Sequence, residues 1–223
     1  MSTIRLTFDR HLGMLRDEVV QISDVVEQSI TLSVKALQEH DMALAQHINE
    51  ADAQVNARRF TAEEHAYQLL ALQQPNARDM RLIVGLVSVV TNLERIGDHA
   101  AGIARLAIRL GEQPVLESPP MFGPMATIAQ WLTRNAMTAF VTCDEALAET
   151  VSKRDAEIDD LHQEAYRQLI DTMTHNPATI EAGTLLLWVS HNLERIGDRA
   201  SNIATRVPYL AKGELVRHPD AML

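Results

Sequence analysis

The sequence has one cysteine, Cys143, and few aromatic residues, prolines or glycines among its 223 residues. A single cysteine excludes an intramolecular disulfide and a multi-cysteine metal site, and it is typical of a reducing compartment. The longest uncharged apolar run, LIVGLVSVV at 82–90, is too short to span a bilayer, and the N-terminus shows no signal-peptide pattern. We therefore expect a cytoplasmic protein without direct membrane insertion.

A basic stripe interleaved with aromatic residues is also missing, and the formal net charge is −10. An acidic chain repels the phosphate backbone of nucleic acids, so we predict no direct nucleic-acid binding. A surplus of acidic side chains suits cations or basic patches on partner proteins, and it equally suits ordinary solubility.

What the sequence does contain is helical periodicity. Apolar residues recur at steps of three and four along two long stretches, and each series predicts a helix that buries one face in a bundle. The two series are Leu86, Val89, Leu93, Ile96, Ala100, Ile103 and Ala107, and Leu186, Val189, Leu193, Ile196, Ala200, Ile203 and Val207. With the other helical patterns, they place helices near 7–39, 41–73, 76–110, 124–151, 153–174 and 178–210.

These two stretches carry an internal repeat. NLERIGDHAAGIA at 92–104 and NLERIGDRASNIA at 192–204 are identical at ten of thirteen positions. Four prolines and two glycines at 111–124 cannot continue a helix and mark a linker. We therefore predict an all-α fold of two tandem antiparallel three-helix bundles, with domains at 1–111 and 124–223 and a linker at 112–123.

Local signals predict several helix ends. Asp41 is a candidate N-cap for the second helix, and Pro75 and Pro177 mark the starts of the third and sixth. Pro208 is expected to end or kink the last helix, because proline lacks the backbone N–H that a helix interior requires.

The repeat holds two carboxylates four residues apart, Glu94 and Asp98, and again Glu194 and Asp198. At about 100° per residue they lie on one side of the helix, roughly 130° to 170° from the buried stripe, so we expect them to face outward. On the flanks of the second and fifth helices, four more side chains carry oxygen donors: Asp52 and Asn56, and Asp155 and Asp159.

Oxygen donors from two facing helices suit a divalent or trivalent metal ion. We therefore predict one metal site in each half, although such an acidic pattern also occurs on solvated helix faces. Gly97 and Gly197 lie within predicted helices, where glycine costs about 1 kcal/mol relative to alanine. They indicate either a close backbone approach or a packing crevice without a metal.

The neighbouring basic residues are open to two interpretations. Arg95 and Arg195 either orient an acid or a partner protein, or form interhelical salt bridges. His65 and His162 are interpreted as surface histidines. His99 is a poor candidate for a ligand shared by both sites, because arginine takes its place in the second copy.

LLALQQPNARDMRLI at 69–83, followed by the first copy of the repeat, resembles the PhoU family of phosphate-transport regulators over essentially the whole chain. The resemblance implies a homodimeric protein peripheral to the inner membrane through its partners, the ATPase subunit of the phosphate ABC importer and the sensor histidine kinase of the phosphate two-component system. Such a protein holds the phosphate-starvation response off when phosphate is plentiful.

The resemblance also implies multinuclear clusters of iron or zinc. It assigns them to Asp52, Glu94 and Asp98 in the first half, and to Asp155, Asp159, Glu194 and Asp198 in the second. The chain has Asn56 where the family usually has an acid, so we predict weaker metal binding in the first half. It also has Gly102 where the family usually has asparagine, and HNPATIEAG at 175–183 matches the upstream motif only loosely.

Two other functions compete with the non-enzymatic regulator. A metal-dependent hydrolase could use the same carboxylate clusters to activate water. Alternatively, the acidic faces dock directly onto basic patches of a partner. The sequence shows no nucleophile–base pair and no glycine-rich phosphate loop, which favours the regulator.

Overall fold

The computed structural model describes residues 3–73, 75–113 and 116–213, and in these residues all regular secondary structure is helical. Six long helices are followed by a short one, and a single 3₁₀ turn, η1, precedes α6. Their bounds are α1 Thr3–Gln38, α2 Met42–Gln73, α3 Ala77–Leu110, α4 Phe122–Thr142, α5 Glu145–His175, η1 Pro177–Thr179, α6 Ile180–Ala204 and α7 Val207–Lys212. The predicted all-α fold is confirmed.

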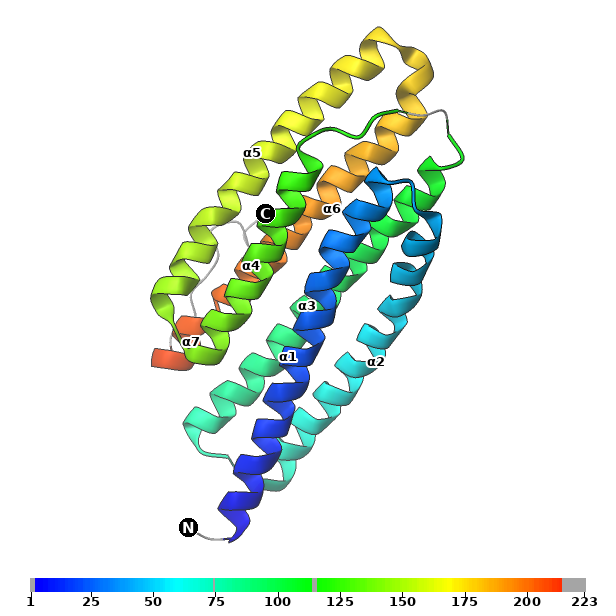
Figure 1. Ribbon diagram of the computed structural model, residues 1–223. Helices are drawn as coiled ribbons and strands as arrows, with labels where there is room; N and C mark the ends of the chain where they lie inside the picture. Colours follow the sequence, from blue (N-terminus) through cyan, green and yellow to red (C-terminus); the bar gives the residue numbers. More distant parts are fainter. Residues whose placement is uncertain (1–2, 74, 114–115, 214–223) are drawn as a thin grey trace.

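The long helices form two groups of three. Helices α1, α2 and α3 pack against one another, as do α4, α5 and α6, and the groups meet where α3 packs on α6 and α1 on α4 (Figure 1). The four helices α1, α3, α6 and α4 thus form a central bundle, with α2 and α5 on opposite outer edges. The predicted tandem of three-helix bundles is therefore present, with a large shared interface.

The two predicted apolar stripes build this interface and the core. Each of their fourteen members is no more than 1% exposed, and buried apolar residues form one continuous cluster through both groups of helices. Leu93 and Leu193 lie at corresponding places in this cluster. The division at residues 112–123 stays a prediction; its outer limits, residues 1 and 223, and residues 114–115 of the linker lie outside the described residues.

The boundary between α4 and α5 differs from the prediction. Helix α4 ends at Thr142 rather than at 151, and α5 already begins at Glu145. Cys143, assigned to a helical pattern in the sequence, has a left-handed backbone with φ 55°, which ends α4. The Asp144 carboxylate then accepts a hydrogen bond from the Leu147 backbone N–H at 3.0 Å and caps α5. The helix boundary predicted at 151–153 is therefore wrong, because these residues lie inside α5.

Other helix ends agree better with the sequence. The Leu44 backbone N–H donates to the Asp41 carboxylate at 2.9 Å, which confirms the predicted cap of α2. After Pro75, the cap of α3 is Asn76, whose side chain accepts hydrogen bonds from two backbone N–H groups at 3.0 Å. Pro177 opens the 3₁₀ turn before α6, and α6 ends before Pro208, which lies in the first turn of α7.

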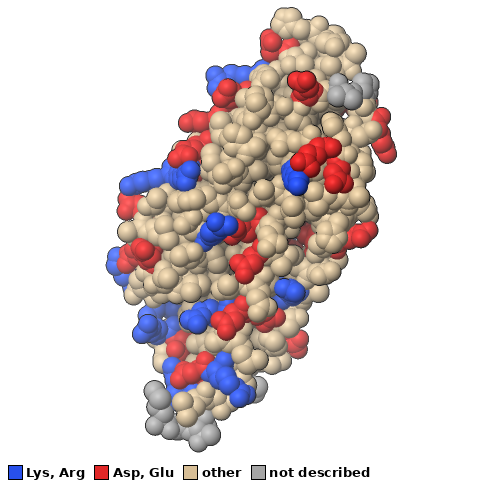
Figure 2. Space-filling model, in the orientation of Figure 1, with Lys and Arg blue, Asp and Glu red and all other residues tan. Residues whose placement is uncertain are grey.

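The α1–α4 contact contains a buried charge. Glu27 is 8% exposed and accepts a hydrogen bond from Arg134 Nε at 3.1 Å. On the face shown in Figure 2, basic and acidic side chains are interspersed. Within the described part of the chain, no helix is both long enough and apolar enough to cross a membrane.

Candidate metal sites between the helices

The first group of predicted ligands meets in the groove between α2 and α3. A Cβ atom placed on Gly97 of α3 would lie 3.4 Å from Oδ1 of Asp52 on α2. The Asp52 carboxylate therefore lies beside Gly97, which follows Glu94 by three residues and directly precedes Asp98. Asn56 donates a hydrogen bond to the second oxygen of Asp52 at 3.3 Å. These are ordinary contact distances, so the structure shows no unusually close approach at Gly97.

The second group meets in the corresponding groove between α5 and α6, where the approach is closer. A Cβ atom on Gly197 would lie only 2.6 Å from Oδ1 of Asp155 and 2.9 Å from a methyl carbon of Ile158. Glu194 and Asp198 flank this glycine on α6. Glycine is required here because a larger residue would collide with α5.

The carboxylates are less exposed than predicted. Glu94 is 7% exposed, so the expected outward orientation is wrong for this residue. Asp155, predicted on the flank of the fifth helix, is also buried, at 9% exposed. The side chains of Asp98 and Asp198 remain 34% and 31% exposed. The position of Glu94 around α3 did not predict its burial, because three neighbouring helices, α1, α2 and α6, cover α3. The acids lie within grooves that remain partly open to water.

The two repeated arginines form ion pairs within their own helices. Arg95 Nη1 lies 3.2 Å from Oδ2 of Asp98, and Arg195 Nη1 lies 2.6 Å from Oδ2 of Asp198. The predicted interhelical salt bridge is therefore wrong for both. In the first groove a further arginine, Arg59 of α2, lies 3.9 Å from Glu94. The first groove thus has more positive charge close to its buried glutamate.

Burial and, to a smaller extent, neighbouring carboxylates raise the pKa values of Asp52, Glu94 and Glu194. Burial raises the pKa of Glu194 to about 7, and the nearby carboxylate of Asp198 adds to the effect. Burial and then Asp98 also raise the pKa values of Asp52 and Glu94. Ionised carboxylates in these grooves repel one another, and a bound cation would relieve that repulsion.

The donor chemistry of both grooves fits a hard cation. Asp52 Oδ1 and Glu194 Oε2 are buried oxygen atoms that accept no hydrogen bond within the described residues. However, no three His, Cys, Asp or Glu side chains in that part of the chain are grouped so that they could hold a metal ion as they stand. Coordination therefore requires side-chain rotation, including release of Asp98 or Asp198 from its arginine. Metal binding stays a prediction.

The sequence reasoning missed a histidine cluster beside the second groove. His162 was predicted to lie on the surface, but it is half-buried, and its Nδ1 lies 2.8 Å from Oγ of the fully buried Ser190. The His191 ring lies 6.4 Å from that of His162, and its Nδ1 is 3.4 Å from Oε2 of Glu194. Aligning the halves would have revealed both, because Arg59 and Thr91 occupy the equivalent positions. His65 is exposed, as predicted.

The α3–α6 contact explains one departure in the repeat. His99 of α3 lies 2.9 Å from the side-chain oxygen of Asn192 on α6. A Cβ atom on Gly102 would approach that same oxygen to 3.1 Å. A larger residue at 102 would displace Asn192, so this glycine belongs to the packing of the two halves.

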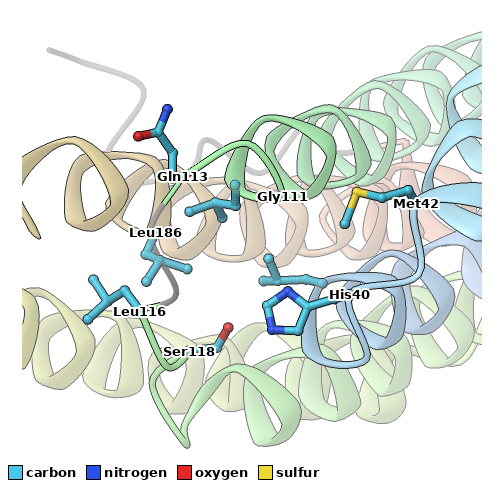
Figure 3. A pocket seen from close by; sticks show the side chains of 9 residues that line it. His40, Met42, Gly111, Gln113, Leu116, Ser118 and Leu186 are labelled. Atoms are coloured by element: carbon cyan, nitrogen blue, oxygen red, sulfur yellow. The ribbon is translucent and has the colours of Figure 1, made fainter.

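A separate cavity of about 270 Å³ lies where the α1–α2 turn and the linker meet α6 (Figure 3). Leu186 of α6 lies between Leu116 and His40 in that view. The residues that line the cavity are mostly apolar and include no Asp or Glu. This cavity is therefore distinct from the acidic grooves.

A sequence model of the PhoU domain matches residues 19–107 and, a second time, residues 123–207. The chain belongs to the PhoU family. One relative, the phosphate-specific transport system accessory protein PhoU homologue of Pseudomonas putida, is 37% identical over 214 residues, covering 95% of this chain and 83% of that protein.

Solved structures of the PhoU family have the same fold. The crystal structure of PhoU from Pseudomonas aeruginosa has a TM-score of 0.87 and 35% identity, covering 93% of this chain and all of that one. The phosphate transport system regulatory protein PhoU from Streptococcus pneumoniae also has a TM-score of 0.87, with 28% identity, covering 95% of this chain and all of that one.

Proposed function

We propose that this chain is a non-enzymatic regulator of phosphate uptake. It binds the ATPase subunit of the phosphate importer and the sensor histidine kinase, and it restrains the phosphate-starvation response when phosphate is plentiful. The observation that carries the proposal is the likeness over nearly the whole chain to proteins named as accessory or regulatory proteins of phosphate transport. The chain acts as a homodimer in the cytoplasm, at the inner membrane through its partners.

In this proposal the two grooves hold metal ions, with iron or zinc as the candidates. Asp52, Asn56, Glu94 and Asp98 would hold the first, and Asp155, Asp159, Glu194 and Asp198 the second. The metal would neutralise the clustered carboxylates and join neighbouring helices. The residues themselves position the donors: Gly197 leaves room for Asp155 of α5, and Arg95 and Arg195 hold Asp98 and Asp198 until a cation replaces them.

The partner proposal is tested by purifying the tagged chain from cells grown with and without phosphate. We expect the importer ATPase or the kinase to be retained. Arg95 and Arg195, whose side chains are 54% and 38% exposed, are the predicted partner contacts. The double variant Arg95→Gln/Arg195→Gln should reduce retention, whereas Arg10→Gln, on an exposed part of α1, should not. Absence of both partners under both conditions would contradict the proposal.

We expect the second groove to bind metal more tightly than the first. Asn56 replaces a carboxylate in the first groove, and Arg59 adds positive charge beside Glu94. Asp198→Ala should therefore remove most of the bound metal and lower the metal affinity about tenfold or more. Loss of a group that only supports a metal ligand already lowers metal affinity about 10–100-fold. Asp98→Ala should have the smaller effect in calorimetric titration, and the reverse ranking would contradict the expectation.

The regulator and the hydrolase are separated by turnover. With Zn²⁺ or Mn²⁺ added, we expect no hydrolysis of a panel of phosphate esters. Turnover that persists through purification and disappears in Asp198→Ala would instead identify the second groove as a hydrolytic centre.

A further inference from the structure

The two grooves differ by three linked replacements close to the second glutamate. In the equivalent register, Arg59 of the first half corresponds to His162 of the second, Val90 to Ser190, and Thr91 to His191. The replacements exchange a cation and two non-ligating residues for two imidazoles and a hydroxyl group. All three lie on the elements that build the groove, since His162 is on α5 and the other two are on α6.

We propose that His162 and His191 are additional ligands of the second groove, which makes it a mixed nitrogen–oxygen site for a borderline divalent cation such as Zn²⁺. The proposal rests on the proposed metal binding of the carboxylates and adds to it. Imidazole nitrogen suits Zn²⁺, Ni²⁺ and Co²⁺, whereas an oxygen-only groove suits harder cations. The two halves of the chain are then selective for different classes of metal.

Ser190 supports this assignment by orienting one ring. Its hydroxyl is fully buried and lies 4.0 Å from the sulfur of Met125, a weak acceptor to which it can donate. When the serine donates to that sulfur, its oxygen can accept from Nδ1–H of His162, which lies 2.8 Å away. In this tautomer, Nε2 of His162 carries a lone pair that can bind a metal. Metal-binding histidines commonly have this arrangement, in which the other ring nitrogen donates a hydrogen bond to a neighbouring group.

The second imidazole is already beside a carboxylate donor. His191 Nδ1 lies 3.4 Å from Glu194 Oε2, an oxygen that accepts no hydrogen bond in the described part of the chain. The ring centroids of His162 and His191 lie 6.4 Å apart, and the His191 side chain is 46% exposed. Binding of both rings to one ion therefore requires the His191 ring to rotate toward His162.

The edge of Trp188 gives the site its own reporter, because its ring lies 5.7 Å from that of His191. Trp131, the second of the two tryptophans in the chain, can be replaced by phenylalanine so that fluorescence comes from Trp188 alone. Ni²⁺ or Co²⁺ bound at His191 should then quench the Trp188 emission. Added Zn²⁺ should displace the quenching ion and restore the emission.

The test compares Zn²⁺ and Mn²⁺ titrations, by calorimetry and by this fluorescence, of the full chain and its variants. His162→Gln/His191→Gln should lower Zn²⁺ affinity about tenfold or more and abolish quenching, with little change for Mn²⁺. The control His47→Gln, on an exposed part of α2, should match the wild type. The reciprocal Arg59→His/Thr91→His should raise Zn²⁺ affinity in the first groove.

The outcomes separate the two proposals. If the double variant binds Zn²⁺ as the wild type does, the histidines are not ligands, while the carboxylate sites stand. If the wild type binds neither Zn²⁺ nor Mn²⁺, metal binding fails and the histidine assignment fails with it. Ser190→Ala provides the decision if the double variant does not fold: an unchanged Zn²⁺ affinity overturns the orienting role, and an approximately tenfold loss supports it.

Discussion

Gly197→Ala should destabilise the protein by up to about 2 kcal/mol. The added methyl would lie 2.6 Å from Oδ1 of Asp155 and 2.9 Å from a methyl carbon of Ile158, distances that require α5 or these side chains to move. Such overpacking costs about 1–3 kcal/mol, and the higher helix propensity of alanine returns about 1 kcal/mol. Urea denaturation followed by circular dichroism measures the difference in the free energy of unfolding.

Gly97→Ala is the matched control in the first groove. There the nearest atoms to the added methyl are Asp52 Oδ1 at 3.4 Å and a methyl carbon of Val55 at 3.5 Å, which are ordinary contacts. This variant should therefore be neutral or more stable by up to about 1 kcal/mol. Equal destabilisation by both substitutions would show that the α2–α3 and α5–α6 contacts do not differ as the structure indicates.

Glu194→Gln should stabilise the metal-free protein above pH 7 by about 1–3 kcal/mol. Burial raises the pKa of Glu194 from 4.5 to about 7, with Asp198, Asp159 and Asp155 adding to the shift and Arg195 opposing it. The folded protein therefore keeps the proton after the unfolded chain has released it. Wild-type stability should fall as pH rises from 4.5 to 7, and glutamine removes this loss.

The measurement is chemical denaturation at several pH values in the presence of a chelator. The variant and the wild type should be similar near pH 4 and diverge progressively towards pH 8. Glu94→Gln is the matched comparison and should have the smaller effect, because Arg95 and Arg59 partly stabilise the charge of Glu94. A pH dependence that Glu194→Gln leaves unchanged would contradict the assignment.

These predictions have a common origin in the different chemistry of two halves that share a repeat. In the first, arginines stabilise a buried glutamate and the helices meet at ordinary distances. In the second, the helices meet more closely and two histidines replace the arginine and threonine. The duplicated motif therefore builds two similar frames with different chemistry.

The sequence by itself determined the helices, the buried stripes and the pairing of acids in each half, because all of these depend on residue spacing along one helix. It also singled out Gly97 and Gly197, but the close approach that it offered as one explanation is present only at Gly197. The end of α4 was predictable in principle, since Asp144 is a good N-cap, but the apolar pattern continues through the turn and conceals it.

Only the tertiary structure decided what covers each helix. Glu94 lies opposite the apolar stripe of α3 but is buried, because α2 and α6 cover the sides of α3 that a single helical period leaves open. In the sequence, His162 is only a polar residue on a polar helix. Its hydrogen-bond partner, Ser190, lies 28 positions later and is brought close by the packing of α5 on α6. Spacing along one helix fixes the direction of a side chain, whereas its burial and its partners depend on helices distant in the sequence.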